Sequence, residues 1–360
     1  MGNVPSKQPA SVGVVGAAFN KGQDKDGVQN GPATLRGGGL QEALNATGAK
    51  VTDYGDVTQP IANEPDKILN CSNQRALIKS TLEIAEAVEK SVSENDLTLI
   101  LGGDHSLGTG SITGHFRAYP NSFVVWVDAH ADINTPEASE SSHTHGMPLA
   151  FIVKETNQLV PQVQGFEKIK PALAASQLIY IGLRDVDKTE LKFLKEFSIT
   201  YFDMHDVKKL GIECVMDIVL RIIAERRYFV SFIFNRPHCK IHLSFDIDAL
   251  DPSFAPSTGT PVPGGLTLKE GKYICRTLAQ TGKLYDECSF CAHIAPQTDV
   301  WLWALFISTN LLYCSKSCVK QGQLKSMDMA EVNPALGSPE DVKTTVESAT
   351  ELLKSALLYQ

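Results

Sequence analysis

Five short apolar runs place the strongest constraint on how this 360-residue chain folds. In each run, apolar residues follow one another with little alternation, and the runs are residues 11–18, 97–101, 123–127, 177–181 and 241–245. Strands of this kind are buried on both faces, because helices cover both sides of a parallel sheet in α/β proteins. The runs therefore predict a central sheet of mostly parallel strands.

Stretches with helical periodicity lie between these runs. In 76–92, apolar residues recur at helical spacing with glutamate and lysine on the opposite side, and 188–197 and 213–224 show the same pattern. Pro339 directly after Ser338 is typical of a helix start, with a capping serine and a first-turn proline. Alternating strands and helices predict a three-layer α/β/α fold with a mostly parallel central sheet. Since no internal repeat or low-complexity linker interrupts the pattern, we expect residues 1–360 to form a single domain.

Two segments do not fit this pattern. Segment 285–324 carries four of the eight cysteines and two of the three tryptophans, but only five charged residues. Its two pairs of cysteines flank an apolar block, which disfavours a zinc site, and that block is shorter than the ~20 residues of a membrane-spanning helix. A smaller aromatic-rich segment, 228–236, falls in an expected helix-to-strand loop. We expect both to be atypical insertions, with a functional lid or partner-binding loop and translated intron sequence both open as their origin.

Charge and the N-terminus indicate which partners and compartment to expect. The formal net charge is −8 and no basic stripe is present, so we expect no nucleic-acid partner. The scattered cysteines, with no apolar segment behind a basic N-terminus, favour reduced thiols and a cytoplasmic location without a signal peptide. Residues 1–6 fit the myristoylation motif at Gly2, but one acyl chain without a polybasic patch anchors only marginally. We therefore expect no stable membrane association.

Metal-ligand residue types follow three of the predicted strands. In an α/β sheet ligands gather just past the carboxyl ends of the strands, and residues two apart in extended chain point to the same side. The side chains that can converge there are two histidines and four carboxylates: His105, Asp128, His130, Asp132, Asp246 and Asp248. Without a cation, so many carboxylates would repel one another, which argues against a purely structural role as turns or caps. Oxygen and imidazole ligands without a thiolate suit Mn²⁺, and bridging carboxylates can hold two ions.

The strand-end motifs also resemble those of a known family. Gly-Gly-Asp-His-Ser at 102–106, Asp-Ala-His-Ala-Asp at 128–132, the aspartate-rich run at 244–252 and the loop at 257–265 resemble the ureohydrolases. These are binuclear manganese enzymes that include arginase, agmatinase and formimidoylglutamase. The resemblance runs from about Val12 to the C-terminus, interrupted at the two atypical segments. Within the family, the stretches at 132–136, 145–148, 184–187 and 331–334 are similar to those of arginases.

The resemblance implies a ligand set and a reaction. One Mn²⁺ would be held by His105, Asp128, Asp132 and Asp246, and the other by His130, Asp128, Asp246 and Asp248, giving two ions per subunit. A metal-activated hydroxide would hydrolyse the guanidinium group of L-arginine to L-ornithine and urea. The family also implies a homo-oligomer, either a trimer or a hexamer. An agmatinase and a catalytically silent relative that binds a ligand or partner are the alternatives.

The resemblance further implies roles around the substrate. The residues near the reacting centre would be Asp132, which moves a proton, His145, a shuttle that titrates near neutrality, and Glu331, which pairs with the guanidinium. The α-carboxylate and α-amino end would be held by Asn134, Ser141, His143 and Asp187. His143 departs from the family, because arginases carry an asparagine that contacts the substrate carboxylate at this place. We expect an altered but retained contact there, since imidazole can still donate a hydrogen bond.

Overall fold

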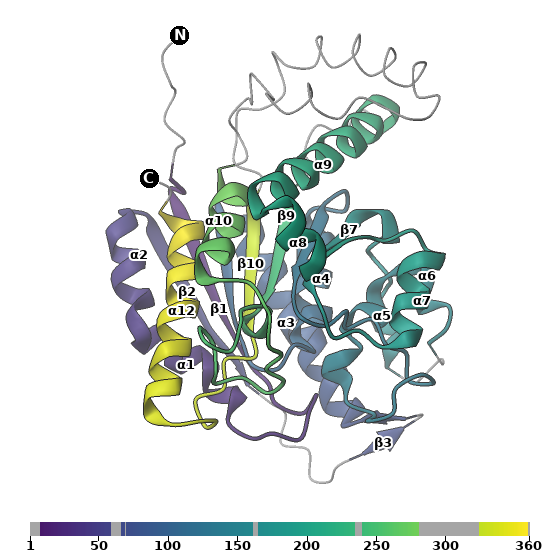
Figure 1. The fold of residues 1–360 in the computed structure, drawn as a ribbon, viewed down its shortest axis with the longest axis horizontal. Coiled ribbons are helices and arrows are strands. Elements are labelled where there is room, and N and C mark those ends of the chain that lie inside the picture. The colour runs from purple at the N-terminus through teal and green to yellow at the C-terminus, as the bar shows by residue number, and fades with distance from the viewer. Residues whose placement is uncertain are drawn as a thin grey trace.

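The structure is a computed structural model, and it describes residues 8–58, 66–68, 70–160, 165–234, 240–280 and 324–358. Its centre is an eight-stranded sheet in which every pair of neighbouring strands is parallel (Figure 1). The strand order is β2-β1-β5-β10-β9-β6-β7-β8. The bounds are β1 Ser11–Ala18, β2 Lys50–Thr58, β5 Leu97–Gly102, β6 Phe123–Val127, β7 Leu178–Leu183, β8 Thr200–Asp203, β9 Ile241–Asp246 and β10 Leu324–Ala330. A separate two-stranded hairpin joins β3 (Lys67–Ile68) to β4 (Cys71–Ser72).

Helices cover both faces of the sheet and form the outer layers (Figure 1). One face packs against α1 Gly31–Leu35, α2 Gln41–Thr47, α8 Met204–Leu210, α9 Ile212–Phe234, α10 Leu268–Ala279 and α12 Pro339–Leu357. The other face packs against α3 Gln74–Glu94, α4 Leu107–Ala118, α5 Pro148–Ile152 and α7 Lys188–Glu196. The short helix α6 Lys154–Asn157 follows α5. Along β6, Val125 and Val127 enter the first core whereas Val124 and Trp126 enter the second, because strand side chains alternate between faces. The predicted three-layer α/β/α fold with a parallel sheet is confirmed.

The predicted strands and helices match the structure closely. All five apolar runs are strands, although β7 begins at Leu178, one residue later than expected, and extends to Leu183. The predicted helix at 76–92 lies within α3, and that at 188–197 matches α7 to within one residue. At the start of α12, Ser338 is the capping residue, and its side chain accepts a hydrogen bond from the backbone N–H of Asp341.

The atypical segments are only partly described. The expected loop at 228–236 was wrong for its first seven residues, because α9 continues to Phe234. No glycine or proline lies between Ile212 and Phe234, so nothing in the backbone stops the helix there. Residues 285–323 and the myristoylation motif lie outside the described residues, whereas Leu324 already belongs to β10 and pairs with Ile241. The single domain and the two insertions therefore stay predictions.

Within the described ranges, no helix is both long enough and apolar enough to cross a membrane.

Candidate metal centre and substrate pocket

The candidate site is built at the carboxyl ends of four adjacent strands. β5, β10, β9 and β6 are neighbours in the sheet, and the chain leaving each of them carries candidate residues. His105 follows β5, Glu331 follows β10, Asp248 follows β9 and Asp128 follows β6. Parallel strands end at the same edge, so the sequence pattern alone brings these side chains to one place.

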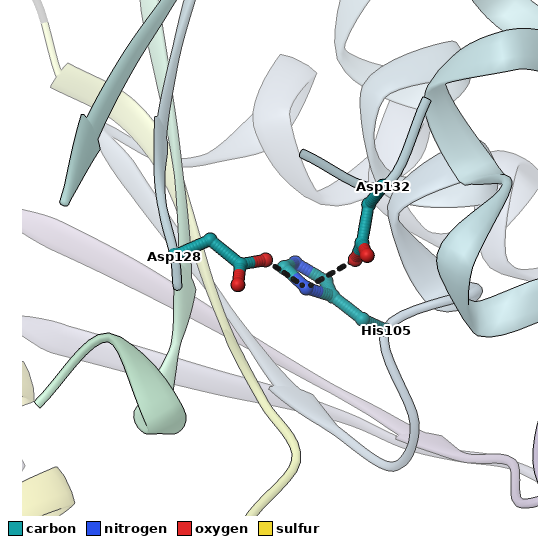
Figure 2. Close-up of side chains that lie close together, drawn as sticks. All are labelled: His105, Asp128 and Asp132. Carbon is teal, nitrogen blue, oxygen red and sulfur yellow. Dashed lines mark ion pairs between the residues drawn. The ribbon is translucent and has the colours of Figure 1, made fainter. Parts of the chain in front are cut away.

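Three carboxylates surround one nitrogen of His105, and Figure 2 shows two of these carboxylates, those of Asp128 and Asp132. Nδ1 of His105 lies 3.1 Å from an oxygen of Asp128, 3.2 Å from one of Asp132 and 2.9 Å from one of Asp246. The indole ring of Trp126 stacks on the imidazole of His105, and its Nε1–H donates to Asp128 at 2.9 Å. The ligand side chains are therefore held in place by packing from β6 as well as by each other.

A second group of ligands shares Asp128 with the first. Nδ1 of His130 lies 3.2 Å from Asp248 and 3.4 Å from the other oxygen of Asp128. The two oxygens of Asp128 thus face two different histidines. Asp248 accepts a hydrogen bond from the Thr260 hydroxyl at 2.9 Å, which orients its carboxylate. This arrangement can hold two cations with Asp128 between them.

The polar atoms at the centre of the cluster fit metal ions better than they fit one another. Nδ1 of His105 is buried and makes no hydrogen bond, although three carboxylate oxygens lie within 3.2 Å of it. Burial and the neighbouring aspartates raise the pKa of Asp246, and they raise the pKa of Asp132 to about 6. A carboxyl group with a raised pKa is one whose charge lacks compensation. Divalent cations would supply that compensation and accept the lone pair of Nδ1.

A pocket opens above this cluster. His130, Asp132 and Asp246 reach it from the metal-ligand set, and all four residues expected to hold the α-amino acid end of the substrate line it. Its lining is His130, Asp132, Asn134, Ser139, Ser141, His143, His145, Gly146, Asp185, Asp187, Glu190, Asp246 and Thr260. His105 and Asp128 are fully buried beneath the pocket, and Asp248 is almost so. The structure thus brings the expected ligands together with the four residues expected at the amino acid end of the substrate.

Glu331 and His145 form a pair beside the pocket, which His145 lines and which the buried Glu331 does not line. Nδ1 of His145 lies 3.1 Å from a carboxylate oxygen of Glu331, which also accepts the backbone N–H of His105 at 2.9 Å. Burial lowers the pKa of His145, but the hydrogen bond to Glu331 and its negative charge outweigh burial and raise this pKa to about 9. The expected titration near neutrality is therefore wrong for the metal-free protein. The second oxygen of Glu331 is buried without a hydrogen-bond partner, which leaves an acceptor for a ligand.

Two of the site residues have left-handed backbone conformations. Asp132 has a φ of 49° and Glu331 has a φ of 61°, and residues other than glycine seldom adopt this backbone region. The backbone N–H of Glu331 donates to the carbonyl of Gly103 at 2.9 Å, which helps to hold this conformation. Such conformations persist where the surrounding structure enforces them, and they concentrate at functional sites.

At the outer part of the pocket, the residues expected to hold the substrate form hydrogen bonds with one another. The amide of Asn134 donates to Asp187 at 2.7 Å, and the hydroxyl oxygen of Ser141 accepts the backbone N–H of His143 at 3.2 Å. The imidazole of His143 lies 2.9 Å from the carboxylate of Asp24. Asp24 was not anticipated from the sequence, because no pattern links an N-terminal loop to a residue more than a hundred positions away.

Sequence reasoning also missed two buried acids beside the site. Glu190 accepts the backbone N–H of Ile133 at 3.1 Å, and burial with the charge of Asp132 raises the pKa of Glu190 to about 8. Asp104 accepts the backbone N–H of Gly22 at 2.7 Å, and burial with the charge of Glu331 raises its pKa to about 7. The position of Asp104 directly before His105 was the one available signal for it.

Comparison with known proteins agrees with this geometry. A model of the arginase family matches residues 10–286. The chain is 39% identical over 350 residues to arginase-1 of Bos taurus, covering 96% of this chain and 92% of that protein. It is 39% identical over 356 residues to the mitochondrial arginase-2 of Homo sapiens, covering 98% and 86%. The crystal structure of Entamoeba histolytica arginase, in complex with L-ornithine, superposes with a TM-score of 0.75 at 28% identity, covering 97% of this chain and 99% of that one. The chain belongs to the arginase family.

Proposed function

We propose that this chain is a binuclear manganese arginase, which hydrolyses the guanidinium group of L-arginine to L-ornithine and urea. The observation that carries the proposal is the pair of ligand groups sharing Asp128 at the base of an acidic pocket. One ion would be held by His105, Asp128, Asp132 and Asp246. The other would be held by His130, Asp128, Asp246 and Asp248. Four carboxylates and two imidazoles without a thiolate favour Mn²⁺ over Zn²⁺.

The residues around the cluster divide the chemistry among them. When bound, the two ions supply the charge that lowers the pKa of water enough to provide hydroxide near neutral pH. Asp132 would accept a hydrogen bond from the attacking hydroxide and carry its proton to the leaving amine. The unpartnered oxygen of Glu331 would accept a charge-assisted hydrogen bond from the planar guanidinium. His145, paired with Glu331 at 3.1 Å, exchanges protons with solvent.

The outer pocket recognises the amino acid end of arginine. Asp187 accepts a hydrogen bond from the α-amino group, while Asn134 and Ser141 donate to the α-carboxylate. His143 would add one donor to this carboxylate, but Asp24 lies 2.9 Å from the imidazole and competes for it. We therefore expect weaker recognition of the carboxylate than an asparagine at position 143 would give.

Three further properties are proposed with the activity. The active protein is a homo-oligomer, a trimer or a hexamer, with two Mn²⁺ per subunit. We place it in the cytoplasm, where its urea release belongs to arginine metabolism such as the urea cycle. Light scattering on the manganese-loaded protein gives the mass of the assembly, and fractionation of cells gives the compartment.

Comparing two substrates tests the proposal. Agmatine has the guanidinium group of arginine but lacks its α-carboxylate, so only arginine can use Asn134 and Ser141. We expect kcat/KM for urea release to be much higher with arginine. A preference for agmatine would instead assign the chain to the agmatinase reaction.

A further inference from the structure

A chain of buried hydrogen bonds leads away from His105, on the side opposite the pocket. Nε2 of His105 lies 2.9 Å from the hydroxyl of Ser244, and that hydroxyl donates to Asp328 at 2.6 Å. Asp328 also accepts the hydroxyl of Ser111 at 2.6 Å and lies 2.9 Å from Nε2 of His242. All of these side chains are fully buried, so water cannot replace any of these partners.

The directions of these hydrogen bonds follow from the chemistry of the partners. A carboxylate only accepts, and a hydroxyl has one proton to donate. Because Ser244 donates to Asp328, its oxygen can only accept from His105, and Nε2 of His105 must carry a proton. Nδ1, which faces the three ligand carboxylates, is then the nitrogen left to bind a cation.

We propose that Asp328 is a positioning residue: acting through Ser244, it fixes the tautomer of His105 and thereby sets the affinity of the metal site at His105. This inference rests on the proposed metal centre, and it adds a residue that touches neither metal nor substrate. Partners in this position orient metal ligands and typically alter metal affinity by about 10- to 100-fold.

Removing the carboxylate of Asp328 should change the tautomer of His105. In an Asp328→Leu variant, the hydroxyl of Ser244 has no carboxylate to donate to and can donate to Nε2 of His105 instead. The neutral imidazole then carries its proton on Nδ1, where it faces the cation. The loss of manganese affinity therefore requires the hydroxyl of Ser244. An Asp328→Leu/Ser244→Ala double variant should bind manganese better than Asp328→Leu alone.

Two further variants separate positioning from stability. In Asp328→Asn, the amide oxygen still accepts from Ser244 and the amide N–H₂ faces Nε2 of His242, so manganese affinity should stay within about twofold of wild type. The network continues from His242 through the hydroxyl of Ser326 to His115, whose Nε2 lies 2.7 Å from the hydroxyl of Ser122. Ser122→Ala removes that hydroxyl at the far end of the network. That variant should lower the melting temperature without changing manganese affinity.

The test is a titration of each folded variant with Mn²⁺ against a competing chelator, with bound metal measured by atomic emission. We expect Asp328→Leu to weaken one of the two sites by about tenfold or more. Ser244→Ala should weaken it less, and the double variant should resemble Ser244→Ala, so that the two effects are not additive.

Unchanged affinity in Asp328→Leu, or losses that add in the double variant, would overturn the proposal. If Asp328→Leu does not fold, the other variants decide. No loss in Ser244→Ala, or an equal loss in Asp328→Asn, then contradicts it. A wild-type protein that binds no manganese would instead refute the proposed function.

Discussion

Nδ1 of His145, a residue that lines the pocket, lies 3.1 Å from the carboxylate of the buried Glu331. The same carboxylate oxygen accepts the backbone N–H of His105, so Glu331 connects a metal ligand to the proposed proton shuttle. An anion held between two such groups stays ionised, and hydrogen bonding to His145 keeps the pKa of Glu331 low against the effect of burial. Glu331 is thus held in its charged form.

This pair predicts a pH dependence of stability in the metal-free protein. The pKa of His145 is about 9 in the folded state, against an unfolded value of about 6.5. A raised folded pKa stabilises fully below pH ~6.5, and that stabilisation is lost as the pH rises through about 9. Replacing His145 with Asn should therefore cost about 1–3 kcal/mol more unfolding free energy at pH 6 than at pH 10.

Urea denaturation of wild type and His145→Asn at both pH values measures this difference. The matched control repeats the comparison in a Glu331→Gln background, where the pH dependence should largely disappear. An equal cost at pH 6 and pH 10 in the wild-type background would show that Glu331 does not stabilise the charged imidazole.

The shared ligand Asp128 predicts the loss of both ions from one substitution. Asp128→Asn removes the charge that faces both His105 and His130, so manganese content should fall well below two per chain and turnover should be abolished. Asp185→Asn is the matched control, since Asp185 is exposed and lies 3.8 Å from Nε2 of His130. Metal analysis after gel filtration distinguishes them. Two manganese ions retained in Asp128→Asn would contradict the bridging role.

The contact between Asp24 and His143 predicts that replacing Asp24 lowers the KM for arginine. Asp24→Asn frees the imidazole to donate to the substrate carboxylate, so KM for arginine should fall about two- to fivefold, the range for an exposed ion pair. KM for agmatine, which has no carboxylate, should not change. Steady-state kinetics with both substrates test this, and an equal shift for both would exclude a role in carboxylate recognition.

The atypical segment at 285–324 predicts tolerance to deletion. β10 begins at Leu324, whose side chain is nearly buried, so the deletion should remove 285–323 and leave that residue in place. We expect the shortened chain to stay soluble and to bind two manganese ions, because no candidate ligand lies within the deleted residues. An unfolded or metal-free product would mean that the segment is structural. Finding the segment in the mature transcript would exclude an intron origin.

Sequence reasoning placed the residues that belong to short motifs and missed those that depend on packing. The metal ligands follow apolar strands directly, so strand prediction alone brings them together. Helix α4 was not predicted from the sequence, and its three glycines lower its helix propensity. The structure explains two of them: a Cβ on Gly110 would lie 2.9 Å from Ile84, and one on Gly114 would lie 2.4 Å from the carbonyl of Ala85. These glycines allow α3 and α4 to pack closely, which a local pattern does not reveal.

The same limit applies to the supporting residues of the site. Asp24 reaches His143 from a loop over a hundred residues away, and Asp328 reaches Ser244 across two neighbouring strands. Neither contact has a sequence signature, because each depends on strand register or loop placement. The polar edge strand β2 was missed for a related reason, since an exposed edge lacks the apolar run that marks a central strand.

Urea release from L-arginine during a manganese titration of the metal-free protein tests the central claim most directly. The account predicts no release without metal, activity that rises with added Mn²⁺ and reaches its maximum at two equivalents per chain, and none at any manganese concentration in Asp128→Asn. A folded wild-type chain that binds two manganese ions but releases no urea from arginine would contradict the account.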